Sequence, residues 1–264
     1  MSDKRKRLVI KFGTGILTEA AANTLATPQF ERLTAEVADL VHKGSECILV
    51  SSGAVGAGLM LLGLAERPKD LSTIQACAAV GQSRLMRLYE TLFARHQLRV
   101  AQLLLTHQDL DSRTRYRNAR NTLERLLRFG SVVPIINEND SVAVEELKFG
   151  DNDRLSAEVA MLCRADLLIL LTSVEGLLDQ NGNCLTEVHD VDGVSGLATR
   201  ETGVYSSGGM VTKLQAVKLA VHAGIPSVVA SGFRSGALSE IVDGKPVGTK
   251  FIVKQDGHSN LPRP

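Results

Sequence analysis

Five short segments of the chain join lysine, carboxylate or amide side chains to glycine, and each has the composition to hold a phosphate or a small polar substrate. In the first, an apolar run ends at Lys11 and continues into Phe12-Gly13-Thr14-Gly15. Glycine lets backbone N–H groups approach a phosphate closely, and lysine adds a compact positive charge. An ordinary tight turn after a strand could have the same residues, so this segment alone leaves both interpretations open. The chain has no G-x-x-x-x-G-K-[ST] sequence, which excludes a phosphate loop of that type.

The next two segments each follow an apolar run. Ser51-Ser52-Gly53-Ala54 starts a stretch of small residues that continues to Gly58. Small residues at the carboxyl end of a strand leave room for a ligand against exposed amides, although close packing of a helix on the strand would use them equally well. Asn137-Glu138-Asn139-Asp140 follows the run Val132–Ile136. A turn needs only one or two of these four polar side chains, which favours a binding function for the others.

The last two segments are expected to open helices. Gly150-Asp151-Asn152-Asp153 has more carboxylates and amides than an N-cap needs, which suggests contact with a ligand or orientation of nearby cations. A lysine in the first turn of a helix opposes the helix dipole by ~0.3–1 kcal/mol, and a bound phosphate would reverse that penalty. We therefore interpret the fifth segment as a phosphate clamp rather than an ordinary loop with a solvated lysine. It consists of Ser207, Gly208, Gly209, Met210, Val211, Thr212 and Lys213.

The elements that must position these segments follow from the alternation of apolar runs with helical patterns. Strands that are apolar throughout and alternate with helices predict an α/β protein with a mostly parallel, doubly wound sheet. Strands are predicted at Leu8–Lys11, Cys47–Ser51, Val100–Leu105, Val132–Ile136, Leu167–Thr172 and Ser227–Ala230. Helices are predicted from Thr27 as N-cap to Gly44, from a Ser72 and Gln75 capping box to about His96, over residues 112–129, after Asp153, and from Gly209 to near Gly224.

Two regions interrupt this alternation. Residues 141–150 are predicted to form a small hairpin beside the site. Residues 174–207 contain several glycines and the tight-turn dipeptide Asn181-Gly182, which predict a peripheral hairpin and a mobile loop. Since the chain has no Pro- or Ser-rich linker, internal repeat or low-complexity block, we expect a single domain with two lobes.

Composition narrows the function classes. The 264 residues are 44% apolar, have a formal net charge of +1 and include no tryptophan, which argues against a dedicated nucleic-acid or membrane surface. No apolar run approaches the ~20 residues that span a bilayer, and the basic residues 4–7 are expected to form a solvated tail. Four scattered cysteines predict buried thiols in a reducing cytoplasm, and His107, His189 and His222 lack the spacing of metal ligands. The arginines of residues 113–120 are expected to form a solvated helix face or a subunit interface rather than a nucleic-acid contact.

In this order, the five segments resemble those of the amino acid kinase family, and within it the members that phosphorylate glutamate on its side-chain carboxylate. The similarity rests on the stretches VIKFGTGILT, LVSSGAVGAG, AAVGQSRLMRLYE, VPIINENDSV, KFGDNDRLSA and SGGMVTKLQAV. It extends from about Leu8 to Phe251, and the combination of INEND, GDND and GGM-x-TK is specific within the family. The resemblance implies a three-layer αβα sandwich, with a substrate lobe over about residues 1–165 and a nucleotide lobe over about residues 166–264.

The resemblance also implies roles for individual residues. Lys11 and Lys213 would neutralise the phosphoryl group during transfer, and Asp153 would hold both lysines in place. The nucleotide would be ATP with Mg²⁺, and no protein ligand for the metal is singled out. The residues expected to bind glutamate are Ser52, Gly53, Ala54, Asp140 and Asn152. The residues expected to contact ATP are Lys11, Gly13, Thr172, Ser173 and the run Ser207–Lys213.

The chain departs from the family's usual pattern at three points. Members often have aspartate where this chain has Ser173 and tyrosine where it has Leu178, which predicts an altered nucleotide affinity or preference. Many bacterial members have a carboxyl-terminal PUA domain, for which a chain ending at Pro264 leaves no room. The family's usual behaviour further implies feedback inhibition by proline through the loop around Val55–Leu71, and a homo-oligomer, dimer or tetramer, in the cytoplasm.

The composition of the five segments suits that activity. A glutamate side chain, with a pKa of about 4.3, is already an anionic nucleophile at neutral pH and needs no general base. The segments supply the cations and amides that would cancel its repulsion from ATP. Two alternatives stay open: a sibling kinase for aspartate, N-acetylglutamate or UMP, and a non-catalytic nucleotide-binding module, which could dispense with Lys11, Lys213 and Asp153. An RNA-binding protein is disfavoured by the charge and the scarcity of aromatic residues.

Overall fold

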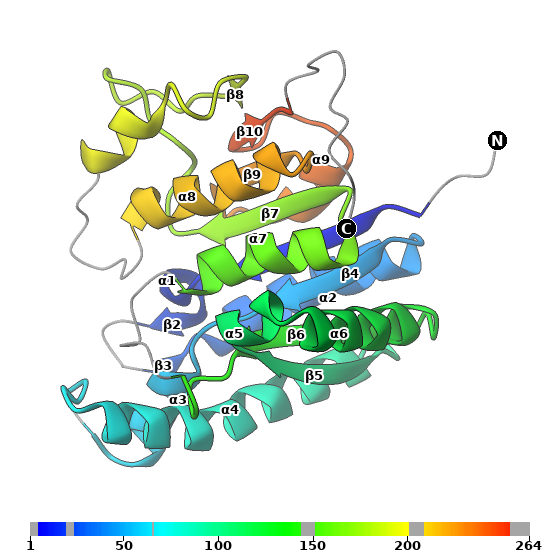
Figure 1. The fold of residues 1–264 in the computed structure, drawn as a ribbon, viewed down its shortest axis with the longest axis vertical. Helices are drawn as coiled ribbons and strands as arrows, with labels where there is room; N and C mark the ends of the chain where they lie inside the picture. Colours follow the sequence, from blue (N-terminus) through cyan, green and yellow to red (C-terminus); the bar gives the residue numbers. More distant parts are fainter. Residues whose placement is uncertain (1–4, 20–23, 65, 144–150, 201–208, 254–264) are drawn as a thin grey trace.

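The main feature of the fold is one large, mostly parallel sheet. The computed structural model describes residues 5–19, 24–64, 66–143, 151–200 and 209–253 (Figure 1). Within these ranges the sheet has eight strands in the order β5-β6-β4-β1-β7-β9-β10-β8. Neighbouring strands run parallel, except that β10 is antiparallel to β9. The strands are β1 (Arg7–Phe12), β4 (Glu46–Val50), β5 (Arg99–Leu105), β6 (Val132–Glu138), β7 (Leu167–Thr172), β8 (Glu187–Val188), β9 (Ser227–Ser231) and β10 (Thr249–Phe251).

Helices cover both faces of this sheet. One hydrophobic core lies between the sheet and α6, α7 and α8, and a second lies between the sheet and α2, α4 and α9 (Figure 1). The three-layer αβα sandwich is therefore confirmed. The helices are α1 (Thr14–Leu17), α2 (Thr27–His42), α3 (Ala54–Leu61), α4 (Leu71–Ala94), α5 (His107–Asp111), α6 (Arg113–Leu127), α7 (Asp151–Cys163), α8 (Gly209–His222) and α9 (Ala237–Val242), with a 3-10 helix at Ser195–Arg200. A small antiparallel pair, β2 (Thr18–Glu19) and β3 (Thr24–Leu25), lies apart from the main sheet.

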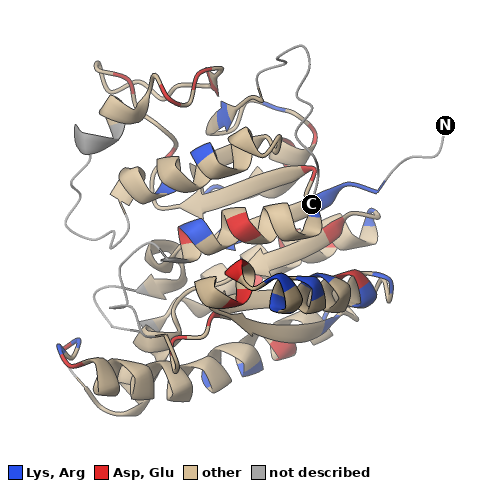
Figure 2. Ribbon diagram, viewed as in Figure 1, with Lys and Arg blue, Asp and Glu red and all other residues tan. Residues whose placement is uncertain are grey.

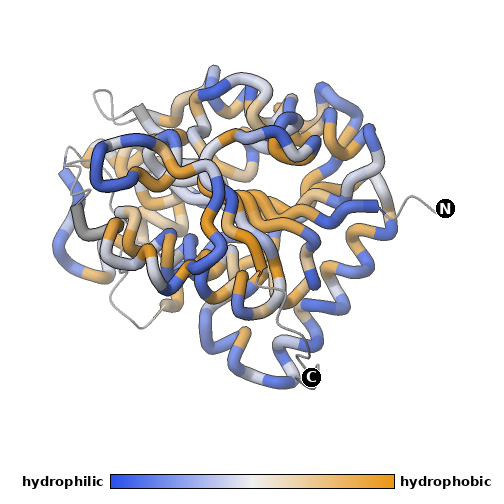
Figure 3. Tube along the Cα trace, turned by 90° about the horizontal axis from the view of Figure 1, so that it is seen from above, coloured by the Kyte–Doolittle hydropathy of each residue, from blue (hydrophilic) through white to orange (hydrophobic). Residues whose placement is uncertain are grey.

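The central strands are apolar on both sides because both sides are covered. In β1, Val9 packs into the core under α7 and α8, whereas Leu8 and Ile10 pack into the core under α2 and α4. A strand that is buried on both faces has a nearly continuous run of apolar residues, and β1 and β7 have such runs in the sequence. Figure 3 shows these hydrophobic strands in the middle of the molecule, with more hydrophilic segments around them.

The six predicted strands and five predicted helices are all present, and their ends differ by a few residues at most. The capping box predicted at Ser72 and Gln75 is wrong. Asp70 is the N-cap of α4, and its side chain accepts a hydrogen bond from the Thr73 N–H at 2.8 Å. The Gln75 amide instead donates to the Ala143 carbonyl at 3.1 Å. Likewise, Thr27 is the first residue of α2, and Ala26 precedes it without a side-chain cap.

The stretch around Val55–Leu71 differs from the expected loop, because its first part is the helix α3. Two glycines let α3 and α4 pack backbone to backbone. A Cβ atom on Gly58 would lie 1.8 Å from the Cys77 carbonyl oxygen, and one on Gly81 would lie 1.8 Å from the Ala54 carbonyl oxygen. The small residues therefore serve close packing, as the structural interpretation held, but the partner of α3 is the helix α4 and not the expected strand. This packing does not exclude ligand contact at Ser52 and Gly53.

A hairpin occurs after β7, as predicted. Leu178 and Cys184 form an antiparallel bridge, and Gly182 takes the positive φ of +83° that a tight turn requires of it. The mobile loop was predicted within residues 174–207, of which 201–207 lie outside the described residues. The hairpin predicted at 141–150 also lies mostly outside them, since 144–150 are not described. Among the helices that are described, none is both long enough and apolar enough to cross a bilayer.

Candidate active site

Four adjacent strands bring most of the predicted site residues to one edge of the sheet. Lys11 lies at the carboxyl end of β1, Ser52 follows β4, Asn137 and Asp140 lie at and after the end of β6, and Thr172 ends β7. The chain passes from β1 to β4 on one side, and later returns from β6 to β7 on the other side of β1. Such a reversal of strand order opens a crevice at the carboxyl ends, where parallel sheets bind ligands.

At this edge, one carboxylate contacts both predicted lysines. Lys11 Nζ lies 2.6 Å from Asp153 Oδ1, and Lys213 Nζ lies 3.5 Å from Asp153 Oδ2. Lys11 comes from β1 and is 6% exposed, Asp153 comes from α7 and is 1% exposed, and Lys213 comes from α8 and is 5% exposed. Two ammonium groups against one carboxylate leave a net charge of +1 in a nearly dry environment. The trio is therefore suited to attract an anion.

Asp153 remains ionised in this environment. Burial by itself would raise the pKa of the Asp153 carboxyl, but the charges of Lys11 and Lys213 and the hydrogen bonds to the carboxylate hold it below its ordinary value. One of those hydrogen bonds comes from the Thr212 hydroxyl, which donates to Oδ2 at 2.8 Å. Asp153 lies in the first turn of α7, where the helix dipole also favours a negative charge.

Helix α8 begins where it was predicted, but the placement of Lys213 in its first turn is wrong. Helix α8 begins at Gly209, so Lys213 lies beyond its first turn, and its Nζ donates back to the Gly209 carbonyl at 3.2 Å. Met210 is buried in the core and Val211 is exposed. Ser207 and Gly208 lie outside the described residues.

The glycine turn after β1 leaves space beside Lys11. The Gly13 N–H donates to the Leu171 carbonyl at 3.1 Å, which ties the turn to β7. A Cβ atom on Gly13 would lie 3.0 Å from that carbonyl oxygen and 3.6 Å from Lys11 Nζ. Any side chain at this position would occupy the space next to the ammonium group. A Cβ on Gly15 would lie 3.5 Å from Ser173 Oγ, so the exposed Ser173 hydroxyl faces the same turn.

The predicted substrate residues lie at the ends of β4 and β6 and in the first turn of α7. The Asn152 amide donates to Ser52 Oγ at 3.1 Å, which joins the end of β4 to the residue preceding Asp153. Gly53 has a φ of +100°, and Ala54 begins α3 directly after it. Asp140 lies within electrostatic range of Arg67. Burial lowers the pKa of the Arg67 guanidinium, and the negative charge of Asp140 opposes that shift.

A buried amide pair lies in the same region, and only its Asn137 member was singled out from the sequence. The Asn137 amide donates to Gln82 Oε1 at 2.8 Å, and the Glu138 backbone N–H donates to Asn137 Oδ1 at 3.0 Å. Gln82 belongs to the stretch AAVGQSRLMRLYE, so a signal was present in the sequence. The pocket that Gln82 lines with Ala54, Glu138 and Asp140 has a volume of about 260 Å³.

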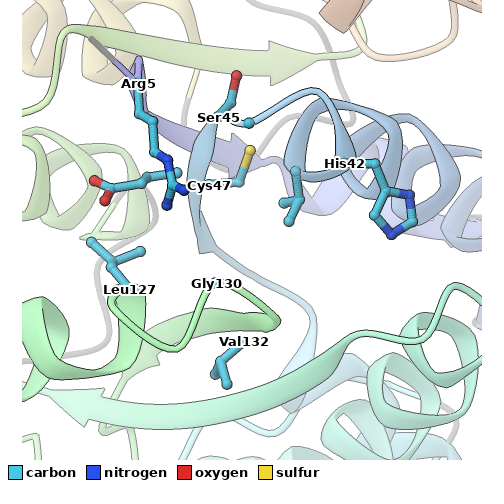
Figure 4. Close-up of a pocket in the computed structure, with 10 residues that line it drawn as sticks. Arg5, His42, Ser45, Cys47, Leu127, Gly130 and Val132 are labelled. Atoms are coloured by element: carbon cyan, nitrogen blue, oxygen red, sulfur yellow. The ribbon is translucent and has the colours of Figure 1, made fainter. Parts of the chain in front are cut away.

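Another pocket, shown in Figure 4, lies at the opposite edge of the sheet. It has a volume of about 220 Å³, and Arg5, Cys47 and Val132 are among the residues that line it at the amino ends of β4 and β6. Burial raises the pKa of the Cys47 thiol to about 12, so this cysteine is unreactive at neutral pH. The prediction of buried thiols holds for Cys47 and two others but is wrong for Cys184, which is exposed.

The predicted arginine-rich helix is α6. Arg113, Arg115 and Arg117 are exposed on it, and Figure 2 shows basic residues along its length. Arg115 pairs with Asp109 at 2.9 Å.

Comparison with known proteins agrees with this geometry. The sequence model of the amino acid kinase family matches residues 6–231. This chain belongs to the amino acid kinase family. The glutamate 5-kinase of Moorella thermoacetica is 48% identical over 259 residues, which cover 95% of this chain and 68% of the relative. The glutamate 5-kinase of Carboxydothermus hydrogenoformans is 47% identical over 257 residues, with the same coverage of 95% and 68%.

Solved structures of other amino acid kinase-fold proteins match the fold of this chain. UMP kinase from Bacillus anthracis superposes with a TM-score of 0.63 at 16% identity, covering 94% of this chain and 96% of that one. Carbamate kinase from Giardia lamblia, bound to AMP-PNP, superposes with a TM-score of 0.63 at 15% identity, covering 94% and 99%. At these identities the likeness concerns the fold alone.

Proposed function

We propose that this amino acid kinase transfers the terminal phosphoryl group of ATP to the side-chain carboxylate of L-glutamate. The product would be L-glutamate 5-phosphate, and the reaction would be the first step of proline biosynthesis. Relatives named glutamate 5-kinase, 44% to 48% identical over most of the chain, support the substrate. The observation that supports the chemistry best is the contact of Asp153 with both Lys11 and Lys213.

The two lysines would neutralise negative charge on the transferring phosphoryl group. A carboxylate nucleophile and a triphosphate repel each other, and the transferring group accumulates negative charge on its oxygens. Lys11 and Lys213 are buried, so their attraction to that charge is screened less than it would be in water. Asp153 would position the two ammonium groups without touching the nucleophile.

The glutamate would lie between the lysines and the end of β6. Ser52 and Asn152, already joined by a hydrogen bond, would orient its side chain next to Asp153, and the amides of Gly53 and Ala54 would add donors. Asp140 would pair with the ammonium group. An N-acetylated substrate has no such group, which favours glutamate over N-acetylglutamate.

ATP supplies the phosphoryl group, and the residues present fit its phosphates. The space beside Gly13, which a Cβ would fill, adjoins the Lys11 ammonium, and Gly209 to Lys213 lie on the other side of Asp153. Thr172 and Ser173 would contact the rest of the nucleotide. Mg²⁺ is commonly held by phosphate oxygens with only one or two carboxylates. By this chemistry, the phosphates would hold most of the ion.

Other properties belong to the same proposal. We propose a cytoplasmic homo-oligomer, a dimer or tetramer, that is inhibited by proline near the glutamate site. The exposed Met60, Leu61 and Leu62 at the end of α3 and the exposed Val80 on α4 support a subunit contact there. The division into a substrate lobe and a nucleotide lobe within one domain is proposed on the same basis. The chain spans 68% of the length of the relatives named above.

An ADP-release assay tests the proposal. The purified protein is incubated with ATP, Mg²⁺ and, in turn, L-glutamate, N-acetylglutamate, L-aspartate and UMP, with and without proline. We expect ADP with glutamate alone among these, and less of it when proline is present. Release with N-acetylglutamate but not with glutamate would replace the proposed substrate, and release with none would reject the activity. Size-exclusion chromatography with light scattering gives the oligomeric state.

A further inference from the structure

Gln82 presents a buried hydrogen-bond donor that nothing among the described residues uses. Its side chain comes from α4 and is 9% exposed. Its Oε1 accepts from Asn137, but its Nε2 is buried without a hydrogen-bond partner in the described structure. An unsatisfied buried amide N–H is unfavourable and calls for an explanation, which a bound ligand can supply.

Neighbouring backbone fixes which end of the Gln82 amide has a hydrogen-bond partner and which end has none. The Glu138 N–H can only donate, so Asn137 must present Oδ1 to it, as the 3.0 Å contact shows. The Asn137 NH₂ group is thereby directed at Gln82. Gln82 must therefore accept with its Oε1, which lies 2.8 Å from Asn137 Nδ2. The Nε2 group of Gln82 is consequently the end that is left for a ligand.

That donor belongs to the pocket at the proposed glutamate site. The pocket, of about 260 Å³, is lined by Gln82 together with Ala54, Glu138 and Asp140. Gly81 holds Gln82 there, because the absence of a Cβ lets the α4 backbone pack against the Ala54 carbonyl. Ala54 in turn follows the segment that contains Ser52.

The charges of this pocket determine which ligand group suits the donor. Glu138 and Asp140 are acidic and would attract the ammonium group of an amino acid. The α-carboxylate of the same amino acid needs a hydrogen-bond donor, which the ionised carboxylates of Glu138 and Asp140 cannot supply. A neutral amide NH₂ fulfils that need, and Arg67, within electrostatic range of Asp140, adds a positive charge nearby.

We propose that the Nε2 group of Gln82 donates a hydrogen bond to the α-carboxylate of the amino-acid substrate. Gln82 would then be a substrate-binding residue that distinguishes an amino acid from an amine lacking the α-carboxylate. The inference rests on the proposed function, since it names a contact to the proposed substrate.

Two variants and three ligands test this contact. Gln82→Glu keeps an oxygen for Asn137 and removes the donor, whereas Gln82→Met removes both. The ligands are L-glutamate, 4-aminobutyrate, which lacks the α-carboxylate, and glutarate, which lacks the ammonium group. The KM for glutamate and the inhibition constants of the other two are measured by ADP release. The matched control is Gln108→Met, because Gln108 is exposed on α5 and does not line this pocket.

Both Gln82 variants are expected to raise the KM for glutamate roughly 10- to 100-fold, as expected for a lost hydrogen bond to a charged group. The inhibition constant of glutarate should rise by a similar factor. The inhibition constant of 4-aminobutyrate should not rise by more than about threefold, and the KM for ATP should stay the same. Gln108→Met should behave as wild type. Thermal unfolding shows whether each variant is folded. If Gln82→Met does not fold, the kinetics of Gln82→Glu alone test the inference.

Two outcomes would overturn the inference. If the variants raise the inhibition constant of 4-aminobutyrate as much as the KM for glutamate, Gln82 only positions Asn137. If the KM for glutamate is unchanged in an active Gln82→Glu enzyme, Nε2 does not meet the substrate. A wild-type protein that releases no ADP with glutamate would instead reject the proposed function, so the two failures are distinct.

Discussion

At the scale of single residues, the arrangement of the proposed site depends on Asp153. Its carboxylate contacts Lys11 through one oxygen, and Lys213 and Thr212 through the other. Because the lysines come from β1 and α8, removing the carboxylate would leave two buried positive charges with no anion between them. The site would then hold its cations in the wrong places even if both remained.

Replacing Asp153 by alanine is expected to lower kcat about 100- to 1000-fold, because misplaced cations no longer match the transition state. The KM for glutamate should change much less, since Asp153 does not touch that substrate in the proposed arrangement. Steady-state kinetics of ADP release measure both constants. Ser52→Ala serves as the comparison, and there the KM for glutamate should rise more than kcat falls. The reverse pattern at Asp153 would reject its positioning role.

The lowered pKa of Asp153 also predicts how stability depends on pH. A carboxyl whose pKa is lower in the folded state stabilises the fold above its ordinary pKa of about 3.9, and that contribution is lost as the pH falls through the folded value. Urea unfolding of wild type and Asp153→Asn should therefore differ most near neutral pH, with the difference shrinking below about pH 4. A difference that stays constant into acid would mean that Asp153 is not ionised in the native protein.

At the scale of elements, the contact between α3 and α4 sets the shape of the proposed substrate pocket. Ala54 comes from α3, Gln82 comes from α4, and the two helices meet through Gly58 and Gly81. Glycine at both contacts brings the backbones closer than any side chain would permit. The small-residue segment read from the sequence therefore has a structural reason in addition to its place beside Ser52.

Gly58→Ala and Gly56→Ala form a matched pair within α3. The first puts a methyl group 1.8 Å from the Cys77 carbonyl oxygen and should destabilise the protein by about 2 kcal/mol or more. The second meets only Thr18 Cγ2 at 3.8 Å and should be neutral or stabilise by up to ~1 kcal/mol, since alanine favours helix. Chemical unfolding measures both. Equal effects of the two substitutions would contradict the close packing of α3 on α4.

At the scale of the whole molecule, Arg7 ties several layers together at the edge opposite the proposed site. Its side chain is 18% exposed and pairs with Glu46 of β4 at 2.7 Å and with Glu124 of α6 at 2.6 Å. The guanidinium also donates to the Cys163 carbonyl at the end of α7, and the Arg7 backbone N–H donates to Asp166 at 2.8 Å. One residue thus links β1 to a neighbouring strand and to two helices.

Arg7→Met should lower the free energy of unfolding by about 2–3 kcal/mol, because Glu46 and Glu124 would remain partly buried without their partner. The KM values should not change, since the proposed site lies at the other edge. Arg95→Met breaks an exposed pair with Glu31 and should cost less than about 1 kcal/mol. Urea unfolding and ADP release measure the two effects. An Arg7 variant as stable as the Arg95 variant would show that the network adds little.

The sequence by itself determined the strands, the long helices, the doubly wound topology and the family, because these follow from apolar runs and from motifs that are local in the chain. It was less informative at α3, which lies in a stretch that the family resemblance implied to be a loop, and at α4, whose N-cap is Asp70 rather than Ser72. Only the tertiary structure decided which side chains meet. The resemblance implied that Asp153 holds Lys11 and Lys213, but the geometry of those contacts depends on strand order. The hydrogen bonds that orient the Gln82 amide depend also on backbone approach at Gly81. Those contacts join residues far apart in the chain, so no local pattern specifies them.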